Sequence, residues 1–133
     1  MAFLPQVNLP VLVLGHSVFL SLAGLRMIFR SPPTKGKPHR ETDMSAMSGV
    51  TTLAIGLAYL ATSYMPIEQN QFLHASVPVR ILLALLATLR LLLVKDLTGE
   101  GRNEMLFVAL YDGLGAVICG WQLENFSGRA PVV

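Results

Sequence analysis

Charged residues are scarce in this sequence. Asp, Glu, Lys and Arg make up 14% of its 133 residues, whereas soluble domains carry about 25%. Hydrophobic residues make up 53% and gather in four long blocks, not in the short periodic stripes of soluble helices. These features exclude an ordinary soluble domain and indicate a chain that lies in a lipid bilayer.

Cysteine is nearly absent, and so are the motifs of the common enzyme classes. Cys119 has no second thiol for a disulfide or a zinc site. His16, His39 and His74 fall in a hydrophobic block and in loops expected on opposite sides of the membrane, so they cannot share a metal ion. No G-x-S-x-G, H-E-x-x-H or G-x-x-x-x-G-K-[ST] motif is present. We therefore exclude serine hydrolases, metalloenzymes and nucleotide-driven pumps, and expect no metal or cofactor.

Four segments are long and apolar enough to cross a bilayer, which takes about 20 helical residues. They are residues 9–29, 44–65, 77–94 and 105–122. The connections between them are short, which predicts neighbouring helices that run in opposite directions. The sequence therefore predicts an all-α polytopic membrane protein, a single domain over residues 1–133 folded as an antiparallel four-helix transmembrane bundle.

The basic residues are distributed unevenly between the two ends of the spans. Seven of the ten lie in or beside the first and third loops: Arg26, Arg30, Lys35, Lys37, Arg40, Lys95 and Arg102. The positive-inside rule places both loops in the cytosol and both termini in the lumen or outside. This arrangement accounts for the net charge of +2 without nucleic acid, which we exclude as a partner. In a eukaryote we expect the protein in the endoplasmic reticulum.

Two polar segments outside the spans are candidates for contacts or modification. The proline-rich first loop carries Lys35, Lys37 and Arg40, which predicts contact with anionic lipid or with a partner. Asn125-Phe126-Ser127 fits the N-x-S/T sequon, and the predicted topology puts it on the luminal side. Asn125 is therefore a glycosylation candidate, although its closeness to the fourth span makes it hard for the modifying enzyme to reach.

Small residues recur on one face of the second and of the fourth span. They are Ser45, Gly49, Thr52 and Gly56 in the second, and Ala109, Gly113, Ala116 and Gly120 in the fourth. Small side chains allow helices to approach closely in lipid, where the hydrophobic effect does not draw helices together. Both faces therefore predict tight helix contacts, although small residues are also common in membrane helices generally.

Asp112 is the clearest charged residue within a span, and a charge at this depth needs a partner or a role. Counted from Glu104 and Lys95, Asp112 and Arg90 lie at comparable depths on neighbouring helices, which predicts an Arg90–Asp112 ion pair. Two alternatives stay open. Arg90 extends to the cytosolic headgroups, or Asp112 is a neutral carboxyl that donates a proton in catalysis.

The remaining polar residues of the spans predict a polar core in two layers. His16 and Tyr59 fall at one height, and Ser21 and Thr52 fall near the level of Asp112. Such a core could bind a carbonyl or hydroxyl of a lipophilic molecule and move a proton. Asp112, His16 and Tyr59 are then the candidate catalytic residues; alternatively, His16 only donates a hydrogen bond between helices.

Three runs carry a family resemblance: VLVLGHSVFLSLAGLRMIFRSP, GVTTLAIGLAYLAT and VRILLALLATLR. With their order and loop lengths, they resemble the small four-helix DoxX-like membrane proteins, the fungal members most of all. A looser likeness is to small four-span scaffold proteins of the sterol pathway in the endoplasmic reticulum. The resemblance implies the four-helix membrane fold but no catalytic residues, because the group has no agreed set.

Two classes of function follow from these observations. The first is a non-catalytic accessory or scaffold protein that supports membrane-bound biosynthesis of a lipophilic metabolite or lipid. Its partners are then the bilayer, biosynthetic enzymes or further copies of itself. The alternative is a cofactor-free intramembrane isomerase or cyclase that takes a lipophilic small molecule, with Asp112 as general acid and His16 or Tyr59 positioning the substrate.

Overall fold

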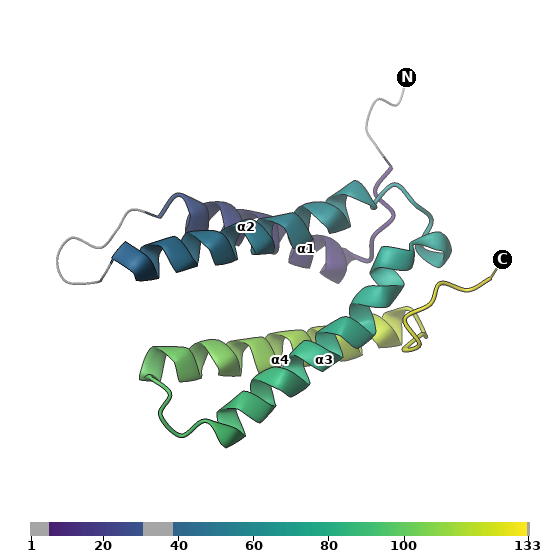
Figure 1. Ribbon diagram of the computed structural model, residues 1–133. Helices are drawn as coiled ribbons and strands as arrows, with labels where there is room; N and C mark the ends of the chain where they lie inside the picture. The colour runs from purple at the N-terminus through teal and green to yellow at the C-terminus, as the bar shows by residue number, and fades with distance from the viewer. Residues whose placement is uncertain (1–5, 31–38, 133) are drawn as a thin grey trace. The chain divides into compact units, whose positions relative to one another are not determined.

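Four long helices dominate the computed structural model, which describes residues 6–30 and 39–132. They are α1 (Val11–Ile28), α2 (His39–Ala61), α3 (Gln71–Leu93) and α4 (Gly99–Gln122), with a short 3-10 helix, η1 (Ile67–Gln69), before α3 (Figure 1). All four are long and apolar enough to cross a membrane. The prediction of an all-α protein with four membrane-spanning helices is confirmed.

The helices pack in two pairs. Contacts divide the chain into two compact units, Met1–Pro66 and Ile67–Val133. In the first unit α1 packs against α2, in the second α3 packs against α4, and the helices of each pair run in opposite directions (Figure 1). Each unit is thus an antiparallel helical hairpin. A single domain over residues 1–133 stays a prediction.

Glycines bring the backbones of α1 and α2 into direct contact. A Cβ added to Gly24 would lie 2.5 Å from the Leu53 nitrogen and 2.7 Å from the Gly49 carbonyl oxygen. At Gly56 it would lie 2.7 Å from the Ser21 nitrogen. No larger side chain fits at these points without separating the helices. The tight contact predicted for the small-residue face of the second span is therefore confirmed at Gly49 and Gly56.

The small residues of α4 contact two different parts of the chain, α3 and the residues that follow α4. Gly113 faces α3, where a Cβ would lie 3.5 Å from the Ala84 methyl group, and Ala116 is fully buried. Gly120 instead lies against the ring of Phe126, which follows the helix. The predicted face of the fourth span thus serves the contact with α3 in part, and the rest of it receives the chain that leaves the helix.

Helices α3 and α4 both begin six residues before the predicted spans. A side-chain cap starts each: Asn70 accepts a hydrogen bond from the Leu73 nitrogen at 3.0 Å, and Thr98 accepts one from the Gly101 nitrogen at 3.1 Å. Pro78 lies inside α3 and does not end it. The early start of α4 confines the turn between α3 and α4 to residues 94–98, so every residue of α4 lies farther from the turn than the sequence predicted.

Most large apolar side chains of the four helices are exposed. Leu22 on α1, Ile55 on α2, Leu86 on α3 and Leu114 on α4 are examples. In a helix that crosses a bilayer, such side chains meet lipid tails, which are as apolar as they are. The buried residues described in the structure are correspondingly few.

Candidate functional site

An ion pair lies in the middle of the second hairpin, between Arg80 of α3 and Asp112 of α4. The Arg80 Nε atom donates to Asp112 Oδ1 at 2.9 Å. The Arg80 side chain is 9% exposed and the Asp112 side chain 19%. A charge within a span is costly unless it is paired, and the contact meets this requirement for both residues.

This partner differs from the one expected, which was Arg90. The reason is the true position of the α3–α4 turn. Asp112 lies 13 residues after Gly99, the start of α4, and Arg80 lies 13 residues before Leu93, the end of α3. In an antiparallel hairpin these two positions face each other, at about 20 Å from the turn for a rise of about 1.5 Å per residue.

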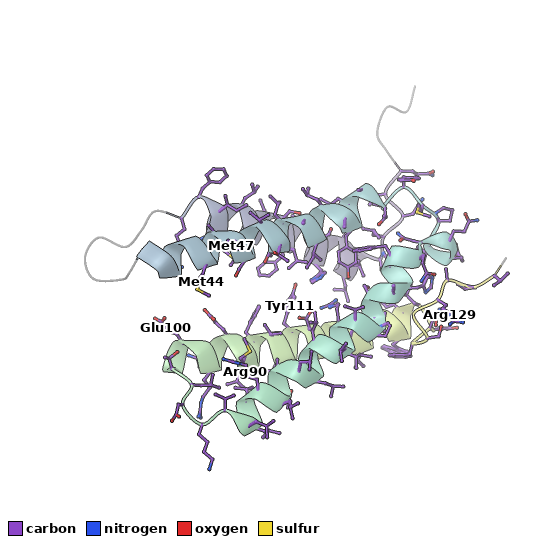
Figure 2. All side chains as sticks on the ribbon, in the orientation of Figure 1. Met44, Met47, Arg90, Glu100, Tyr111 and Arg129 are labelled. Carbon is purple, nitrogen blue, oxygen red and sulfur yellow. The ribbon has the colours of Figure 1, made fainter. Side chains whose placement is uncertain are left out.

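Arg90 lies far closer to the turn. It is three residues from the end of α3, which is about 4.5 Å along the helix axis, and its side chain is exposed (Figure 2). Counting the depth of Asp112 from Glu104 instead of Gly99 caused the wrong pairing. The exposed position near the helix end fits the alternative in which the guanidinium of Arg90 extends to the headgroups.

Further polar and aromatic contacts of Arg80 come from α4. Its Nη2 atom donates to the Tyr111 carbonyl oxygen at 3.2 Å, and its guanidinium carbon lies 5.7 Å from the centre of the Tyr111 ring. The guanidinium also contacts Gly115, where a Cβ would overlap it. The Arg80 guanidinium thus lies in a recess on α4 that is formed by a carboxylate, a carbonyl, an aromatic face and a glycine.

A second polar contact lies in the first hairpin, between His16 of α1 and Tyr59 of α2. The ring centres are 5.4 Å apart and the ring planes make an angle of 80°. This is the edge-to-face geometry that aromatic pairs favour. His16 is 9% exposed and Tyr59 2%. The expectation that these two residues lie at one height is confirmed.

Ser21 and Thr52 were expected near the level of Asp112. Their hydroxyl groups instead form hydrogen bonds within their own helices. Ser21 donates to the Ser17 carbonyl oxygen at 2.9 Å, and Thr52 donates to the Ser48 carbonyl oxygen at 2.8 Å. Such bonds to the preceding helical turn are common for Ser and Thr. Asp112 and Arg90, which were expected at the same level, belong to the second hairpin.

The three candidate catalytic residues are therefore divided between the hairpins. His16 and Tyr59 touch each other in the first, whereas Asp112 lies in the second and is held by Arg80. Neither hairpin alone assembles all three. The described residues contain no group of three or more His, Cys, Asp or Glu placed to bind a metal ion.

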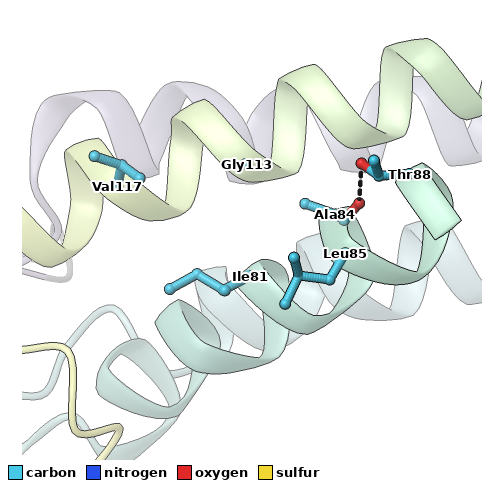
Figure 3. A pocket seen from close by; sticks show the side chains of 6 residues that line it. All are labelled: Ile81, Ala84, Leu85, Thr88, Gly113 and Val117. Carbon is cyan, nitrogen blue, oxygen red and sulfur yellow. Dashed lines mark hydrogen bonds between the residues drawn. The ribbon is translucent and has the colours of Figure 1, made fainter.

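A shallow groove of about 240 Å³ lies between α3 and α4 (Figure 3). It is lined by Ile81, Ala84, Leu85, Thr88, Gly113 and Val117. The hydroxyl of Thr88, its only side-chain polar group, donates to the Ala84 carbonyl oxygen at 2.8 Å. The groove has the character of a lipid-facing surface and offers no group for proton transfer.

A polar cluster at the start of α3 was not foreseen. The chain after α4, residues 123–132, folds back onto it; we call these residues the C-terminal segment. The buried His74 bonds to η1 through Nε2 (Ile67 carbonyl, 3.1 Å) and to the C-terminal segment through Nδ1 (Asn125 Nδ2, 3.1 Å). The available signal was Asn125-Phe126-Ser127-Gly128, whose residue types favour a turn.

The fold uses the sequon of Asn125 for this contact. Its Nδ2 atom, to which a glycan would attach, also donates to the Arg129 carbonyl oxygen at 2.7 Å. With the bond to His74, both hydrogens of the amide nitrogen are engaged. Lys35 and Lys37 lie outside the described residues. Arg40 lies in the first turn of α2, and its side chain is also outside the description.

Comparison of the chain with protein-family models, with curated proteins and with solved structures finds no match in any of the three. The resemblance to DoxX-like proteins therefore stays a prediction. The residues and their geometry define a membrane-spanning helical protein whose second hairpin holds an ion pair at its middle.

Proposed function

We propose that the chain is a small integral membrane accessory or scaffold protein that supports membrane-bound biosynthesis of a lipophilic metabolite or lipid. The observation that carries this proposal is the pairing of Asp112 with Arg80. In this pair the carboxyl group that a catalytic role would need accepts a hydrogen bond from the Arg80 guanidinium. This contact supports a structural role for Asp112 over a catalytic one.

The alternative is the cofactor-free isomerase or cyclase. It requires Asp112 as a neutral acid, and therefore requires the ion pair to break and leave Arg80 unpaired within the span. Removing one partner of a buried pair costs about 3–5 kcal/mol. The apolar lining of the groove between α3 and α4 supplies no substitute acid. Both facts favour the accessory role.

The proposed orientation has the first and third loops in the cytosol and both termini in the lumen or outside. Arg80 is paired within α3, so it does not add positive charge to the luminal end. Arg129 is then the one basic residue on that side, against seven at the cytosolic ends. This uneven distribution supports the orientation. Location in the endoplasmic reticulum, in a eukaryotic host, is part of the same proposal.

In this orientation the basic first loop is the surface that meets partners. Lys35, Lys37 and Arg40 would contact anionic headgroups or an acidic surface of a biosynthetic enzyme. The third loop provides a matched control, since Lys95 and Arg102 lie on the same side of the membrane. If the first loop alone makes the contact, neutralising its three basic residues abolishes the contact, and neutralising Lys95 and Arg102 does not.

The test is complementation of a deletion strain, with protein abundance and extracted lipophilic metabolites measured together. We expect the wild type and the double variant Lys95→Gln/Arg102→Gln to restore the metabolite profile. The triple variant Lys35→Gln/Lys37→Gln/Arg40→Gln should reach normal abundance without restoring it. Full restoration by the triple variant would show that the first loop has no such role.

One further variant separates the two functions. Arg80→Gln/Asp112→Asn removes both charges at once, so it avoids an unpaired charge and also removes the acid. An accessory protein with this double substitution accumulates normally and restores the metabolite profile. An isomerase or cyclase accumulates normally and fails to restore it, with its substrate building up, and that result would overturn the accessory proposal.

A further inference from the structure

The C-terminal segment is held against the start of α3 by a small set of hydrogen bonds. Gln71 makes two of them: its Nε2 atom donates to the Gly128 carbonyl oxygen at 2.8 Å, and its Oε1 atom accepts from the Ala130 nitrogen at 2.7 Å. Gly128, at a φ of 76°, packs against the ring of Pro78. The contact is local, and its buried polar centre is His74, which is 2% exposed.

The partners of His74 fix where its proton lies. The Ile67 carbonyl oxygen can only accept, so the Nε2 atom that lies 3.1 Å from it carries the hydrogen. In the neutral ring the Nδ1 atom is then an acceptor, and it faces Asn125 Nδ2, which is a donor. The contact with the C-terminal segment therefore requires the neutral imidazole.

The amide of Asn125 cannot turn over to suit a protonated ring. Its Oδ1 atom already accepts from the Ser127 nitrogen at 2.9 Å and from the Ser127 hydroxyl at 2.7 Å. Its Nδ2 atom also donates to the Arg129 carbonyl oxygen. Turning the amide would break all three bonds, so Nδ2 continues to face His74.

We propose that His74 is a pH-sensitive latch whose protonation releases the C-terminal segment from α3. A proton on Nδ1 places two donors against each other, at His74 and at Asn125. It also places a positive charge in the first turn of α3, the positive end of the helix dipole. Both effects oppose the closed contact. Release of the C-terminal segment separates the two facing donors and so removes the first effect.

The charged groups on the neighbouring elements are few and lie at the surface. They are Glu68 of η1, and Glu124 and Arg129 of the C-terminal segment, all exposed. The first turn of α3 has no acidic residue. No carboxylate is hydrogen-bonded to either ring nitrogen, since both nitrogens already have the partners described above.

Opening the latch would change what the end of the second hairpin around His74 presents to its surroundings. The Nδ2 atom of Asn125 and the amide of Gln71 would both lose their partners in the fold. Histidine is the side chain whose charge most readily responds to pH, so exposure of this end would depend on pH. This inference does not depend on the proposed accessory function.

The test is amide hydrogen exchange on the full chain in lipid nanodiscs, at about pH 8 and about pH 5. The reporters are the Ser127 and Ala130 nitrogens, which donate to Asn125 and Gln71. After correction for the intrinsic pH dependence of exchange, we expect both to exchange about tenfold faster at the lower pH. Unchanged exchange in the wild type would overturn the proposal.

Two variants provide the controls. His74→Asn keeps a carbonyl oxygen that can accept from Asn125 and cannot be protonated, so its reporters should stay protected at both pH values. His39→Asn, in the other unit, should respond as the wild type does. An acid response that persists in His74→Asn would show that another group titrates, and the proposal would be wrong.

One outcome needs a second measurement. If the reporters of His74→Asn exchange fast at both pH values, the ring nitrogens of wild-type His74 are followed by nitrogen NMR. Two results together support the latch. The hydrogen lies on Nε2 at about pH 8, and the ring changes its protonation at the same pH midpoint as the exchange rate of the Ser127 amide. A hydrogen on Nδ1, or two different midpoints, refutes it.

Discussion

Removing the carboxylate of Asp112 tests the central structural claim. In Asp112→Ala the Arg80 guanidinium keeps its bond to the Tyr111 carbonyl oxygen, at 3.2 Å, and its contact with the Tyr111 ring. It loses the 2.9 Å bond that neutralises it. An unpaired buried charge costs about 3–5 kcal/mol, and a charge at mid-span costs about 2.5–3.5 kcal/mol on insertion scales. We therefore expect a loss of about 3 kcal/mol in the free energy of unfolding.

The assay is reversible unfolding by a denaturing detergent in bicelles, followed by the fluorescence of Trp121, the single tryptophan. Arg90→Gln is the matched control, because Arg90 is exposed and lies three residues from the end of α3. Its effect should stay within about 0.5 kcal/mol. Equal losses for Asp112→Ala and Arg90→Gln would refute the assignment of Arg80 as the partner.

A double-mutant cycle separates the ion pair from other effects of the substitutions. In Arg80→Gln/Asp112→Asn no charge is left unpaired, so the double variant should be more stable than Asp112→Asn alone. Residues in contact typically show interaction energies of about 0.5–3 kcal/mol, and a buried pair belongs at the upper end. Additive losses would mean that the two side chains act independently.

Two other contacts yield predictions with controls of their own. Gly49→Val should destabilise the first hairpin by about 1–3 kcal/mol, because its Cβ would lie 2.8 Å from the Met27 Cβ. The measurement is the same detergent unfolding followed by helical circular dichroism, since Trp121 lies in the second hairpin. Gly15→Ala, which meets nothing within 4 Å, should cost nothing or stabilise α1, and equal losses at both glycines would contradict the close contact. Gln71→Ala should weaken the C-terminal segment by about 1–2 kcal/mol, since it removes two hydrogen bonds, measured as faster amide exchange at Ala130. The control Gln69→Ala should leave that exchange unchanged; a matching increase would show that Gln71 has no special part.

The spans were predictable because mean hydropathy over about 20 residues is a strong signal. Their starts were not, since Asn70 and Thr98 extend α3 and α4 by caps that lie outside the apolar blocks. That error of six residues is small for topology and large for contacts. It moves the expected partner of Asp112 by several helical turns, from Arg80 to Arg90.

Contacts within the first hairpin were easier to predict than those near the chain end. His16 and Tyr59 could be matched by depth, because the predicted bounds of the first two spans, residues 29 and 44, place the two residues at nearly equal distances from that end of the hairpin. The contact of His74 with Asn125 joins residues 51 apart in sequence. It depends on a turn after α4 whose direction no periodicity in the sequence specifies.

The polar contacts also bear on how the chain enters a membrane. In hydrocarbon, an unsatisfied polar group costs several kcal/mol, so it must find a partner before or during insertion. Arg80 finds Asp112 within the second hairpin, and His16 lies against Tyr59 within the first. In the described part of the chain, every buried side-chain nitrogen and oxygen has a hydrogen-bond partner. Because the charged pair is complete within one hairpin, that hairpin can insert as a unit without waiting for the other. The order of helices along the chain, with the two members of each pair adjacent, provides such units directly.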